Sequence, residues 1–301
     1  MVHDVIVVGG SFAGLSAAMQ LARARRRVLV IDAGRPRNRF AASSHGFLGQ
    51  DGKPPREIQQ EALRQLLAYP TVAFVEGEAV SASRTEGGFS VALAGGREEA
   101  ATFCLILAIG MADELPPIPG LQERWGATVL HCPYCHGYEV AGRPLGVLAS
   151  HALSTHQAGM LPDWGPTTYF TQGEFEPEAG QAAYLAARGV TIERSPVVEL
   201  LGAAPDLEAV RLADGRVVPV AALFTAARMR MASPLAEQLG CAVDDGPLGP
   251  RLRVDDFKQT TVPGVFAAGD AATPMHNATL ASASGVMAGV CAHRSLMGMA
   301  A

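Results

Sequence analysis

The sequence has few cysteines, a low share of charged residues and no long apolar run. Its 301 residues include five cysteines, an odd number, and the isolated ones are expected to be packing thiols because nothing indicates a secretory context. Charged residues make up 18% and the net charge is −5, which argues against a nucleic-acid or anionic-membrane partner. No segment reaches the roughly 18 apolar residues of a membrane span, and the first residues lack a signal-peptide pattern. We therefore expect a cytoplasmic protein.

Hydrophobic residues are plentiful, at 49% of the chain, and the length is enough for two domains that each bury a core. The chain begins with a short apolar strand at 4–8, which leads into the turn Gly9-Gly10-Ser11-Phe12-Ala13-Gly14 and a helix over 15–25. A second strand at 28–31 ends on Asp32. This order of strand, glycine turn, helix, strand and acid is typical of a dinucleotide-binding βαβ unit.

The glycine turn has the chemistry that a pyrophosphate needs. Gly9 permits the tight exit from the strand, Gly14 lets the helix pack closely on the sheet, and the helix N-terminus offers free N–H groups and a positive dipole end. Ser11 replaces the middle glycine and keeps a small side chain there. Asp32 follows Gly14 by 18 residues and is placed to accept hydrogen bonds from a ribose diol. The alternative is that the turn serves only strand–helix packing.

A second acidic turn, late in the chain, favours FAD over NAD. The run Val265–Asp270 is a strand that ends in Gly269-Asp270, and a helix rich in small residues follows over 276–296. The ribityl chain of a flavin needs a partner near a second strand end, and this carboxylate and helix end can supply it. Asp270 can also cap the last helix, and the two roles can coexist.

Between these two patterns the chain is expected to form a second α/β domain. Residues 34–55 read as a long polar loop, and the proline-rich segment 115–120 marks a domain boundary. We place the FAD-binding domain at 1–116 and 246–301, with a smaller inserted domain at 117–245. Further elements are expected at 57–68 (a helix) and, as strands or hairpins, at 72–76, 78–94, 98–102, 104–109, 145–148, 167–171, 190–193, 197–200, 209–212 and 223–226.

The expected inserted domain carries the run His131-Cys132-Pro133-Tyr134-Cys135-His136. A Cys-x-x-Cys pair at a helix start brings two sulfurs within disulfide reach, and helical N–H groups stabilise the thiolate and lower its pKa. The alternative is half of a zinc site. No second Cys-x-x-Cys or matching Cys/His pair occurs elsewhere in the sequence, so no metal is expected. The other cysteines, Cys104, Cys241 and Cys291, lack motif spacing and are expected to be buried.

Taken in this order, the Val7-Val8-Gly9-Gly10 turn, the central Cys-x-x-Cys and the late Val265–Asp270 run resemble the thioredoxin reductase-like flavoproteins over nearly the whole chain. The resemblance implies an α/β fold of two Rossmann-like, three-layer ββα domains, bound FAD and a homodimer. The runs 34–38 and 45–52 resemble the FAD-contacting loops of a subgroup of that family. The residues expected to contact FAD are Gly9, Ser11, Phe12, Ala13, Gly14, Asp32, Ala33, Arg37, Asn38, Gly110, Gly269 and Asp270.

The resemblance also implies roles for the dithiol. Cys135 is expected to be the flavin-proximal thiol, and Cys132 the interchange thiol that meets the substrate. Thioredoxin reductases place an aspartate after the second cysteine, whereas this chain has His136, and an imidazole is a good thiol base near neutral pH. The Cys-x-x-Cys-His-Gly arrangement resembles dithiol oxidases that close disulfides in sulfur-containing natural products. The alternative is that His136 only caps or packs, and the role of His131 stays open.

A pyridine-nucleotide reductase needs a second glycine turn after the strand 145–148, and the sequence lacks one. The next residues, 149–155, contain no glycine, and His151 stands where the backbone must approach a pyrophosphate. Thioredoxin reductases carry a basic run after the following strand to hold the 2′-phosphate, whereas Glu174 and Glu176 occupy this place and would repel it. The sequence therefore predicts poor use of NADPH. The alternative is that a divergent loop still binds it.

We therefore expect an FAD-dependent oxidoreductase acting on sulfur groups. A small-molecule or thioredoxin-like dithiol would reduce the Cys132–Cys135 disulfide, two electrons would pass to FAD, and oxygen or another acceptor would reoxidise the flavin. The main alternative runs in the opposite direction: ferredoxin, reduced flavin or NADPH feeds the flavin, and the dithiol reduces a thioredoxin or a small disulfide. A third hypothesis is a non-catalytic, flavin-binding redox sensor.

Overall fold

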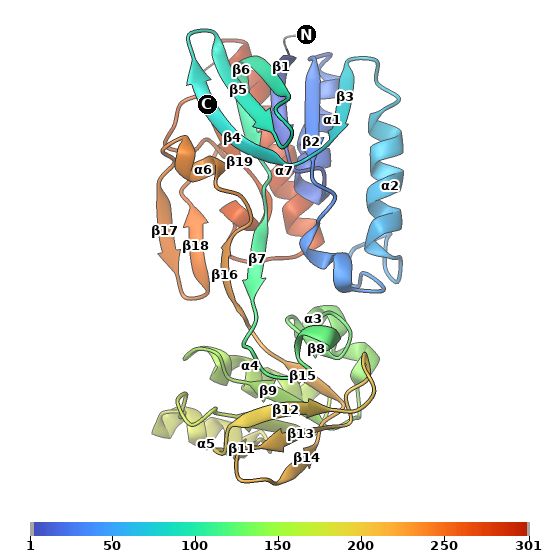
Figure 1. Cartoon of the computed structure of the whole chain (residues 1–301), viewed down its shortest axis with the longest axis vertical. Helices are drawn as coiled ribbons and strands as arrows, with labels where there is room; N and C mark the ends of the chain where they lie inside the picture. Colours follow the sequence, from blue (N-terminus) through green and yellow to red (C-terminus); the bar gives the residue numbers. More distant parts are fainter. Residues whose placement is uncertain (1–2, 300–301) are drawn as a thin grey trace. The chain divides into compact units, whose positions relative to one another are not determined.

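The computed structural model describes residues 3–299; residues 1, 2, 300 and 301, which belong to the expected FAD domain, lie outside the described residues. The chain folds into two compact units (Figure 1). The first unit contains the residues up to Arg39, the segment Pro55–Ala112 and the residues from Arg230 onward. The second unit contains Phe40–Pro54 and Asp113–Met229. The first unit is thus assembled from three separate segments of the chain.

The first unit has a central sheet of parallel strands in the order β3-β2-β1-β6-β19. Strand β6 is long: its end pairs with β19, and its start forms an antiparallel meander with β5 and β4. The elements of this part are β1 (His3–Val8), α1 (Phe12–Arg23), β2 (Val28–Asp32), α2 (Pro55–Leu66), β3 (Val72–Glu76), β4 (Ala79–Thr85), β5 (Gly88–Leu93), β6 (Glu98–Leu107), β19 (Val265–Ala267) and α7 (Ala278–Leu296).

The central strands of this unit are apolar because both faces of the sheet are covered. Val5 on one face packs in a core with α1 and α7, and Ile6 on the opposite face is also fully buried. Helices α1 and α7 approach each other closely because α7 carries glycine at the contact. A Cβ on Gly285 would lie 2.0 Å from the carbonyl oxygen of Ala13. The small residues of the last helix therefore serve helix–helix packing.

The second unit is also built on a parallel sheet that is covered on both faces. Its parallel sheet has the order β11-β10-β9-β15-β8 and separates two cores, one shared with α4 and α5 and the other with an antiparallel meander of β12, β13 and β14. The elements are β8 (Val129–Leu130), α3 (Pro133–His136), β9 (Leu145–Leu148), α4 (Ser154–Met160), β10 (Thr167–Phe170), α5 (Ala179–Ala187), β11 (Thr191–Glu193), β12 (Val197–Leu201), β13 (Ala209–Leu212), β14 (Val217–Pro219) and β15 (Ala222–Phe224).

Two short strands, β7 and β16, carry the chain between the units and pair with each other.

Within residues 3–299, no helix has the length and apolar character needed to cross a lipid bilayer. The remaining elements are η1 (Arg37–Phe40), β7 (Met111–Glu114), η2 (Gln122–Arg124), η3 (Tyr138–Val140), η4 (Leu161–Asp163), β16 (Arg228–Met231), α6 (Leu235–Gln238), β17 (Val243–Gly246), β18 (Gly249–Leu252) and η5 (Gly269–Ala272).

The chain returns to the first unit earlier than the expected boundary at residue 245. Residues from Arg230 onward already belong to that unit, because α6 packs on β4 through the side chain of Gln238. Its Oε1 accepts the N–H of Ala82 at 3.0 Å, and its Nε2 donates to the carbonyl oxygen of Val80 at 3.1 Å. This contact joins residues 156 and 158 positions apart, and a local sequence pattern does not reveal such a pairing.

Most of the predicted strands agree with the structure to within one or two residues, but three features differ. The strands expected at 98–102 and 104–109 are one strand, β6. The first helix begins at Phe12 rather than at residue 15, because Ser11 in the glycine turn is already its extended N-cap. The short helices α4 and α5 and the β17-β18 hairpin were not predicted, since each has too few residues to show a clear hydrophobic period.

Candidate active site

The turn after β1 has the close backbone packing that the sequence predicts. Gly9 has a φ of +105°, and a Cβ there would lie 2.1 Å from the carbonyl oxygen of Ala108. A Cβ on Gly14 would lie 1.7 Å from the carbonyl oxygen of Gly9. Within the described residues, the side chain of Ser11 makes no capping hydrogen bond to α1. Glycine is therefore required at both positions, and the start of α1 keeps the N–H groups that suit a pyrophosphate.

Asp32, at the end of β2, is held in place by the glycine turn. Its Oδ1 accepts the N–H of Gly10 at 3.0 Å, and its Oδ2 lies 3.5 Å from Nε2 of Gln59. Gln59 also donates from Nε2 to the carbonyl oxygen of Gly10 at 2.6 Å. The carboxylate is therefore preorganised beside the turn, where it fits a ribose diol. Sequence analysis missed Gln59, because its place on α2 carries no motif.

Asp270, in η5 after β19, pairs with Arg37. Its Oδ2 lies 3.0 Å from Nη1 of Arg37, and the same Nη1 lies 2.8 Å from Nδ1 of His276. The other ring nitrogen of His276, Nε2, is 3.1 Å from the carbonyl oxygen of Thr273. A carbonyl only accepts, so Nε2 carries the proton and Nδ1 accepts from Arg37. The structure thus brings together two residues expected to contact FAD and adds His276, which sequence analysis missed.

The alternative role of Asp270, as the cap of the last helix, is wrong. The N-cap of α7 is Asn277, whose side chain accepts the N–H of Leu280 at 2.7 Å. Asp270 lies in a separate short helix, so its carboxylate is not committed to capping α7. This leaves it able to serve a ligand.

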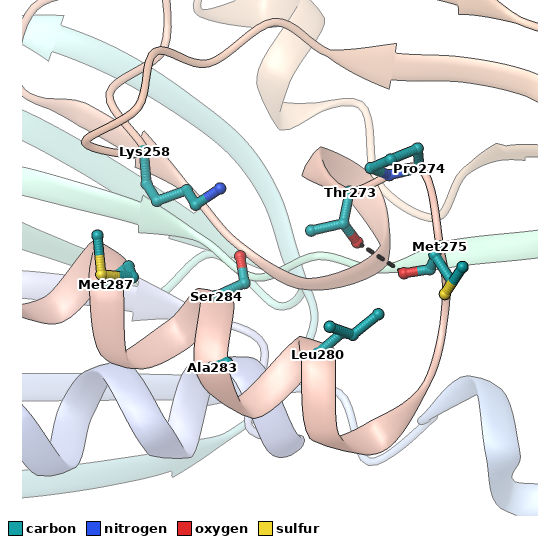
Figure 2. Close-up of a pocket in the computed structure, with 8 residues that line it drawn as sticks. All are labelled: Lys258, Thr273, Pro274, Met275, Leu280, Ala283, Ser284 and Met287. Carbon is teal, nitrogen blue, oxygen red and sulfur yellow. Dashed lines mark hydrogen bonds between the residues drawn. The ribbon is translucent and has the colours of Figure 1, made fainter.

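A cavity of about 370 Å³ is lined by residues of α7 and of the segment just before it, together with Lys258 (Figure 2). Two of its lining residues, Ser284 and Thr273, bind the backbone of Gly269: Oγ of Ser284 accepts its N–H at 3.3 Å, and Oγ1 of Thr273 donates to its carbonyl oxygen at 3.0 Å. Thr273 is also within 3.3 Å of the carbonyl oxygen of Met275. These contacts fix the turn that precedes α7.

The other residues expected to contact FAD also belong to the first unit. Phe12 and Ala13 begin α1, Ala33 is exposed just after β2, Asn38 is half-buried in η1, and Gly110 has a φ of +66°. The structure therefore brings the predicted residues into one unit. Their contact with a flavin stays a prediction.

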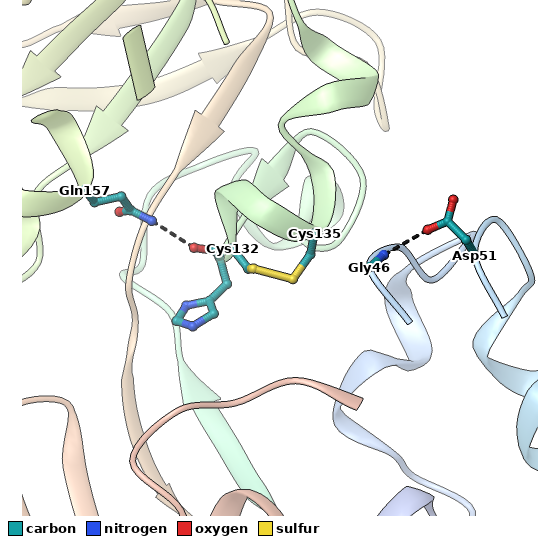
Figure 3. Close-up of a disulfide and its surroundings, with 6 residues drawn as sticks. Gly46, Asp51, Cys132, Cys135 and Gln157 are labelled. Atoms are coloured by element: carbon teal, nitrogen blue, oxygen red, sulfur yellow. Dashed lines mark hydrogen bonds between the residues drawn. A yellow bond between two sulfur atoms is a disulfide. The ribbon is translucent and has the colours of Figure 1, made fainter. Parts of the chain in front are cut away.

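The second unit carries the dithiol at the start of a short helix. Cys132 is the N-cap of α3 and is joined to Cys135 by a disulfide, with the two Cα atoms 5.3 Å apart (Figure 3). Pro133 lies in the first turn of the helix, where its missing N–H has no helical partner to lose. Both cysteines are half-buried. The predicted geometry, a disulfide at a helix start, is thus confirmed.

His136 follows Cys135 directly and has a buried imidazole. Among the described residues, neither Nδ1 nor Nε2 has a hydrogen-bond partner, although both atoms are buried. Burial lowers the pKa of His136 below its ordinary value of 6.5, while the charge of Glu139 raises this pKa and that of His45 lowers it. A buried polar atom without a partner costs about 1–3 kcal/mol. Its presence beside a redox disulfide favours a chemical role over simple packing.

Aromatic side chains flank the disulfide. The ring of Tyr134, between the two cysteines, is 75% exposed and meets Trp164 edge-on with ring centroids 5.6 Å apart. Tyr138, one helical turn later, is 85% exposed. On the other side, the carbonyl oxygen of His131 accepts a hydrogen bond of 2.8 Å from Nε2 of Gln157 (Figure 3). Exposed aromatic rings therefore border the Cys-x-x-Cys turn.

The segment 40–54 belongs to the dithiol-bearing unit. Its His45 has Nε2 at 3.4 Å from Oε1 of Glu139 and Nδ1 at 3.6 Å from Oδ1 of Asp51. The run 45–52 was expected to resemble a loop that contacts FAD. Besides contacts within the loop, the structure places His45 against Glu139, and the flavin contact stays a prediction. Sequence analysis missed His45 and Glu139 as site residues, since only the fold brings them together.

The turn after β9 uses its backbone N–H groups internally. Oγ of Ser154 accepts the N–H of Ser150 at 3.2 Å and lies 3.4 Å from the N of His151. Nδ1 of His151 accepts the N–H of Leu153 at 3.0 Å. A pyrophosphate needs such N–H groups to be open at a helix start. Here side chains of the same turn occupy them.

An ion pair occupies the region after β10. Nη2 of Arg194 lies 2.5 Å from Oε1 of Glu176, and Glu174 nearby in the sequence is exposed. Both partners of this ion pair are largely exposed, so its contribution to stability is small. Its effect on a ligand is larger, because the carboxylate neutralises a cation that could otherwise attract a phosphate.

The three remaining cysteines are buried, as predicted, and none of them forms a disulfide within the described chain. Burial raises the pKa of Cys104 to about 11 and also raises the pKa of Cys241 and Cys291. These thiols are therefore protonated and unreactive near neutral pH. Across residues 3–299, no three His, Cys, Asp or Glu side chains gather in an arrangement that could hold a metal ion.

Two three-layer α/β units, a glycine turn shaped for a pyrophosphate and a disulfide at a helix start define a dinucleotide-dependent disulfide oxidoreductase. Residues 3–153 and 167–285 match the model of the pyridine nucleotide-disulphide oxidoreductase family, and the chain belongs to this family. Within this family the chain is similar to thioredoxin reductases in sequence and fold, so the protein is a flavin-containing, FAD-dependent oxidoreductase.

Individual relatives agree with this assignment. The chain is 33% identical to the thioredoxin reductase tcpT of Claviceps purpurea, over 98% of this chain and 94% of that protein. It is 30% identical to the thioredoxin reductase sirT of Leptosphaeria maculans, over 96% and 92%. The crystal structure of an oxidoreductase from Agrobacterium tumefaciens matches with a TM-score of 0.94 and 53% identity, over 99% of both chains. The predicted two-domain α/β fold is confirmed.

Proposed function

We propose that the protein is an FAD-dependent dithiol oxidase. It takes two electrons from a substrate dithiol through Cys132 and Cys135, passes them to FAD and finally delivers them to oxygen. The observation that carries the proposal is the imidazole of His136, which is buried directly after the disulfide and has no hydrogen-bond partner among the described residues. Such a group accepts a thiol proton at neutral pH, which is the first requirement for thiol oxidation.

The chemistry begins when a substrate thiol gives its proton to His136 and attacks Sγ of Cys132. The Cys132–Cys135 bond breaks, Sγ of Cys135 leaves as a thiolate, and the imidazolium of His136 returns the proton to it. The second substrate thiol then attacks the mixed disulfide, which releases the oxidised substrate and the thiol of Cys132. Two electrons and two protons have then moved from the substrate to the protein dithiol.

Bound FAD would supply the two-electron acceptor for the dithiol and the site at which oxygen would be reduced to hydrogen peroxide. In our proposal, Gly9, Gly14 and the start of α1 hold the pyrophosphate, Asp32 holds the ribose and Asp270 the ribityl chain. The fit rests on the glycine positions, where any Cβ would clash, and on the carboxylate of Asp32 fixed by Gly10. Further proposed contacts are Ser11, Phe12, Ala13, Ala33, Arg37, Asn38, Gly110 and Gly269.

We also propose that NADPH is not an efficient electron donor. Two separate features support this: Ser154 occupies the N–H groups of the turn after β9, and Glu176 neutralises Arg194 after β10. The second candidate function is a thioredoxin or small-disulfide reductase fed by ferredoxin, reduced flavin or NADPH. The names of the fungal relatives favour it. In either direction we expect a thiol or disulfide substrate and a homodimer.

Stopped-flow absorbance of the FAD-loaded protein separates these functions. The dithiol oxidase predicts that anaerobic dithiothreitol bleaches the flavin, that oxygen restores the colour and that peroxide accumulates over many turnovers. Bleaching by NADPH within milliseconds would overturn the proposal in favour of an NADPH-dependent reductase. A flavin that no thiol reduces would indicate a redox sensor. Cys135→Ser is the negative control for thiol-driven bleaching.

A further inference from the structure

Glu139 lies on the same helical surface as His136. Helix α3 ends at His136, Gly137 has helical angles of −67° and −31°, and η3 spans Tyr138–Val140, so the helical course continues from one residue to the other. Residues three apart on a helix are neighbours on one face. The side chain of Glu139 is 39% exposed, whereas both ring nitrogens of His136 are buried. The helical spacing therefore puts a partly exposed carboxylate near a buried base, whose pKa responds to its charge.

A second imidazole holds Glu139 from outside this helix. Nε2 of His45 lies 3.4 Å from Oε1 of Glu139 and 3.0 Å from Oγ of Ser43. On its other side, Nδ1 of His45 lies 3.6 Å from Oδ1 of Asp51, which also accepts the N–H of Gly46 at 2.9 Å (Figure 3). The loop therefore folds back on itself around His45. His45 is only 20% exposed, so its ring has a defined place.

We propose that Glu139, positioned by His45, carries protons between the buried imidazole of His136 and solvent. The inference rests on the function proposed above, because the protons are those of the substrate dithiol. His136 and Glu139 change only N–H and O–H bonds, and no electrons pass through them. Each turnover moves two protons from the substrate to the protein dithiol. They leave when the disulfide re-forms, and two protons are taken up as oxygen becomes hydrogen peroxide.

The groups around the imidazole act on it in opposite directions. The titratable groups there are Glu139 on the same helical run, His45 and, behind it, Asp51 on the segment 40–54, and the thiols of the reduced dithiol. Burial lowers the pKa of His136 most, Glu139 raises this pKa, and His45 lowers it. Removing Glu139 and removing His45 should therefore move the titration of His136 in opposite directions. A role in packing alone does not produce these shifts, and the rate measured beside them tests whether Glu139 carries the proton.

The test uses Glu139→Gln and His45→Gln in the full-length, FAD-loaded protein. Two measurements are made across neutral pH: the rate at which the dithiothreitol-reduced protein re-forms the Cys132–Cys135 disulfide in oxygenated buffer, by rapid quench and thiol alkylation, and the titration of the His136 ring by NMR. Glu139→Gln should shift both midpoints to lower pH and slow the re-formation of the disulfide about tenfold. His45→Gln should shift both midpoints to higher pH. Glu139→Asp, which keeps a carboxylate, should recover part of the lost rate.

Two matched controls come from exposed residues of the same chain. Glu86→Gln, in the turn between β4 and β5, and His156→Gln, in α4, should leave both midpoints unchanged. If thiols reduce the flavin of the wild-type protein but Glu139→Gln and His45→Gln do not shift the midpoints in opposite directions, the proton path is wrong and the proposed function stands. If dithiothreitol reduces neither the disulfide nor the flavin of the wild-type protein, the proposed function fails, and the proton path fails with it.

Discussion

Arg37 and Asp270 are 233 positions apart in the sequence, yet Nη1 of one lies 3.0 Å from Oδ2 of the other. The two side chains are only 18% and 19% exposed, and His276 contacts the same Nη1 at 2.8 Å. Both charged residues are proposed to contact FAD. In this structure the two side chains form an ion pair with each other, so binding of the ribityl chain must replace or extend this contact.

The Arg37–Asp270 pair should stabilise the protein without FAD more than an exposed pair does. A double-mutant cycle with Arg37→Met and Asp270→Asn should give a coupling of about 1–3 kcal/mol in the free energy of unfolding of the apoprotein by urea. The coupling should fall once FAD is bound, because Asp270 then serves the ribityl hydroxyls. The exposed pair Glu61–Arg64 is the control, and its coupling should be much smaller because solvent screens both charges. A zero coupling for Arg37 and Asp270 would contradict the geometry.

Gly14→Ala should prevent FAD binding and destabilise the first unit. The added Cβ would lie 1.7 Å from the carbonyl oxygen of Gly9, and a backbone atom in a tight turn cannot move aside without disrupting the turn. We expect a loss of about 3 kcal/mol or more in the free energy of unfolding. Gly180→Ala, in α5, is the matched control: a Cβ there meets no described atom within 4 Å, and the change should stabilise the helix slightly. Chemical denaturation and flavin absorbance of both variants check this.

Cys135→Ser should keep FAD bound and abolish the transfer of electrons from thiols to the flavin. The flavin residues proposed here lie in the first unit and Cys135 in the second, so the substitution leaves the glycine turn intact. The measurement is anaerobic flavin absorbance during addition of dithiothreitol. Cys241→Ser, which removes a buried thiol of the first unit, should bleach like the wild-type protein. Undiminished bleaching of Cys135→Ser would show that the thiol next to His136 is not the electron donor.

His136→Ala should slow thiol exchange about a hundredfold near neutral pH, within the range expected for a general base. The neutral imidazole is the active form, and burial lowers the pKa of His136 below 6.5. The wild-type rate should therefore persist below pH 6.5 and fall only as the pH drops through this lowered pKa. The alanine variant should lose that acid limb and show only the ionisation of the attacking thiol at high pH. His156→Ala is the control, and an unchanged pH profile for His136→Ala would refute the base role.

The nucleotide turn was predictable because its chemistry is local. Gly9, Gly14 and Asp32 lie within one βαβ unit, where a strand, a turn and a helix follow one another and the spacing alone fixes their relation. The dithiol was predictable for the same reason, since three positions separate Cys132 from Cys135. In both cases the short spacing limits the chemistry that these residue types can perform together.

Residues that act through long-range contacts escaped prediction. Gln59 and His276 stand in segments that carry no motif, and His45 lies in a run that the resemblance assigned to FAD contact. Each makes its contact with a partner that is distant in sequence. The end of the inserted segment was misplaced because α6 belongs to the first unit through contacts with β4. The sequence of a short helix that is held by one polar side chain does not show to which domain the helix belongs.

The sequence by itself determined the class of this protein: a discontinuous α/β oxidoreductase with a dinucleotide turn and a Cys-x-x-Cys-His dithiol. These features are set by hydrophobic period, glycine geometry and short spacing, which act within a few residues of the chain. Only the tertiary structure decided that Arg37 faces Asp270, that Gln59 fixes Asp32 by way of the Gly10 turn, and that His45 stands against Glu139 near the base His136. Such pairings depend on how strands and loops from distant segments pack. The burial of a side chain and the charges beside it are therefore set only when those segments come into contact.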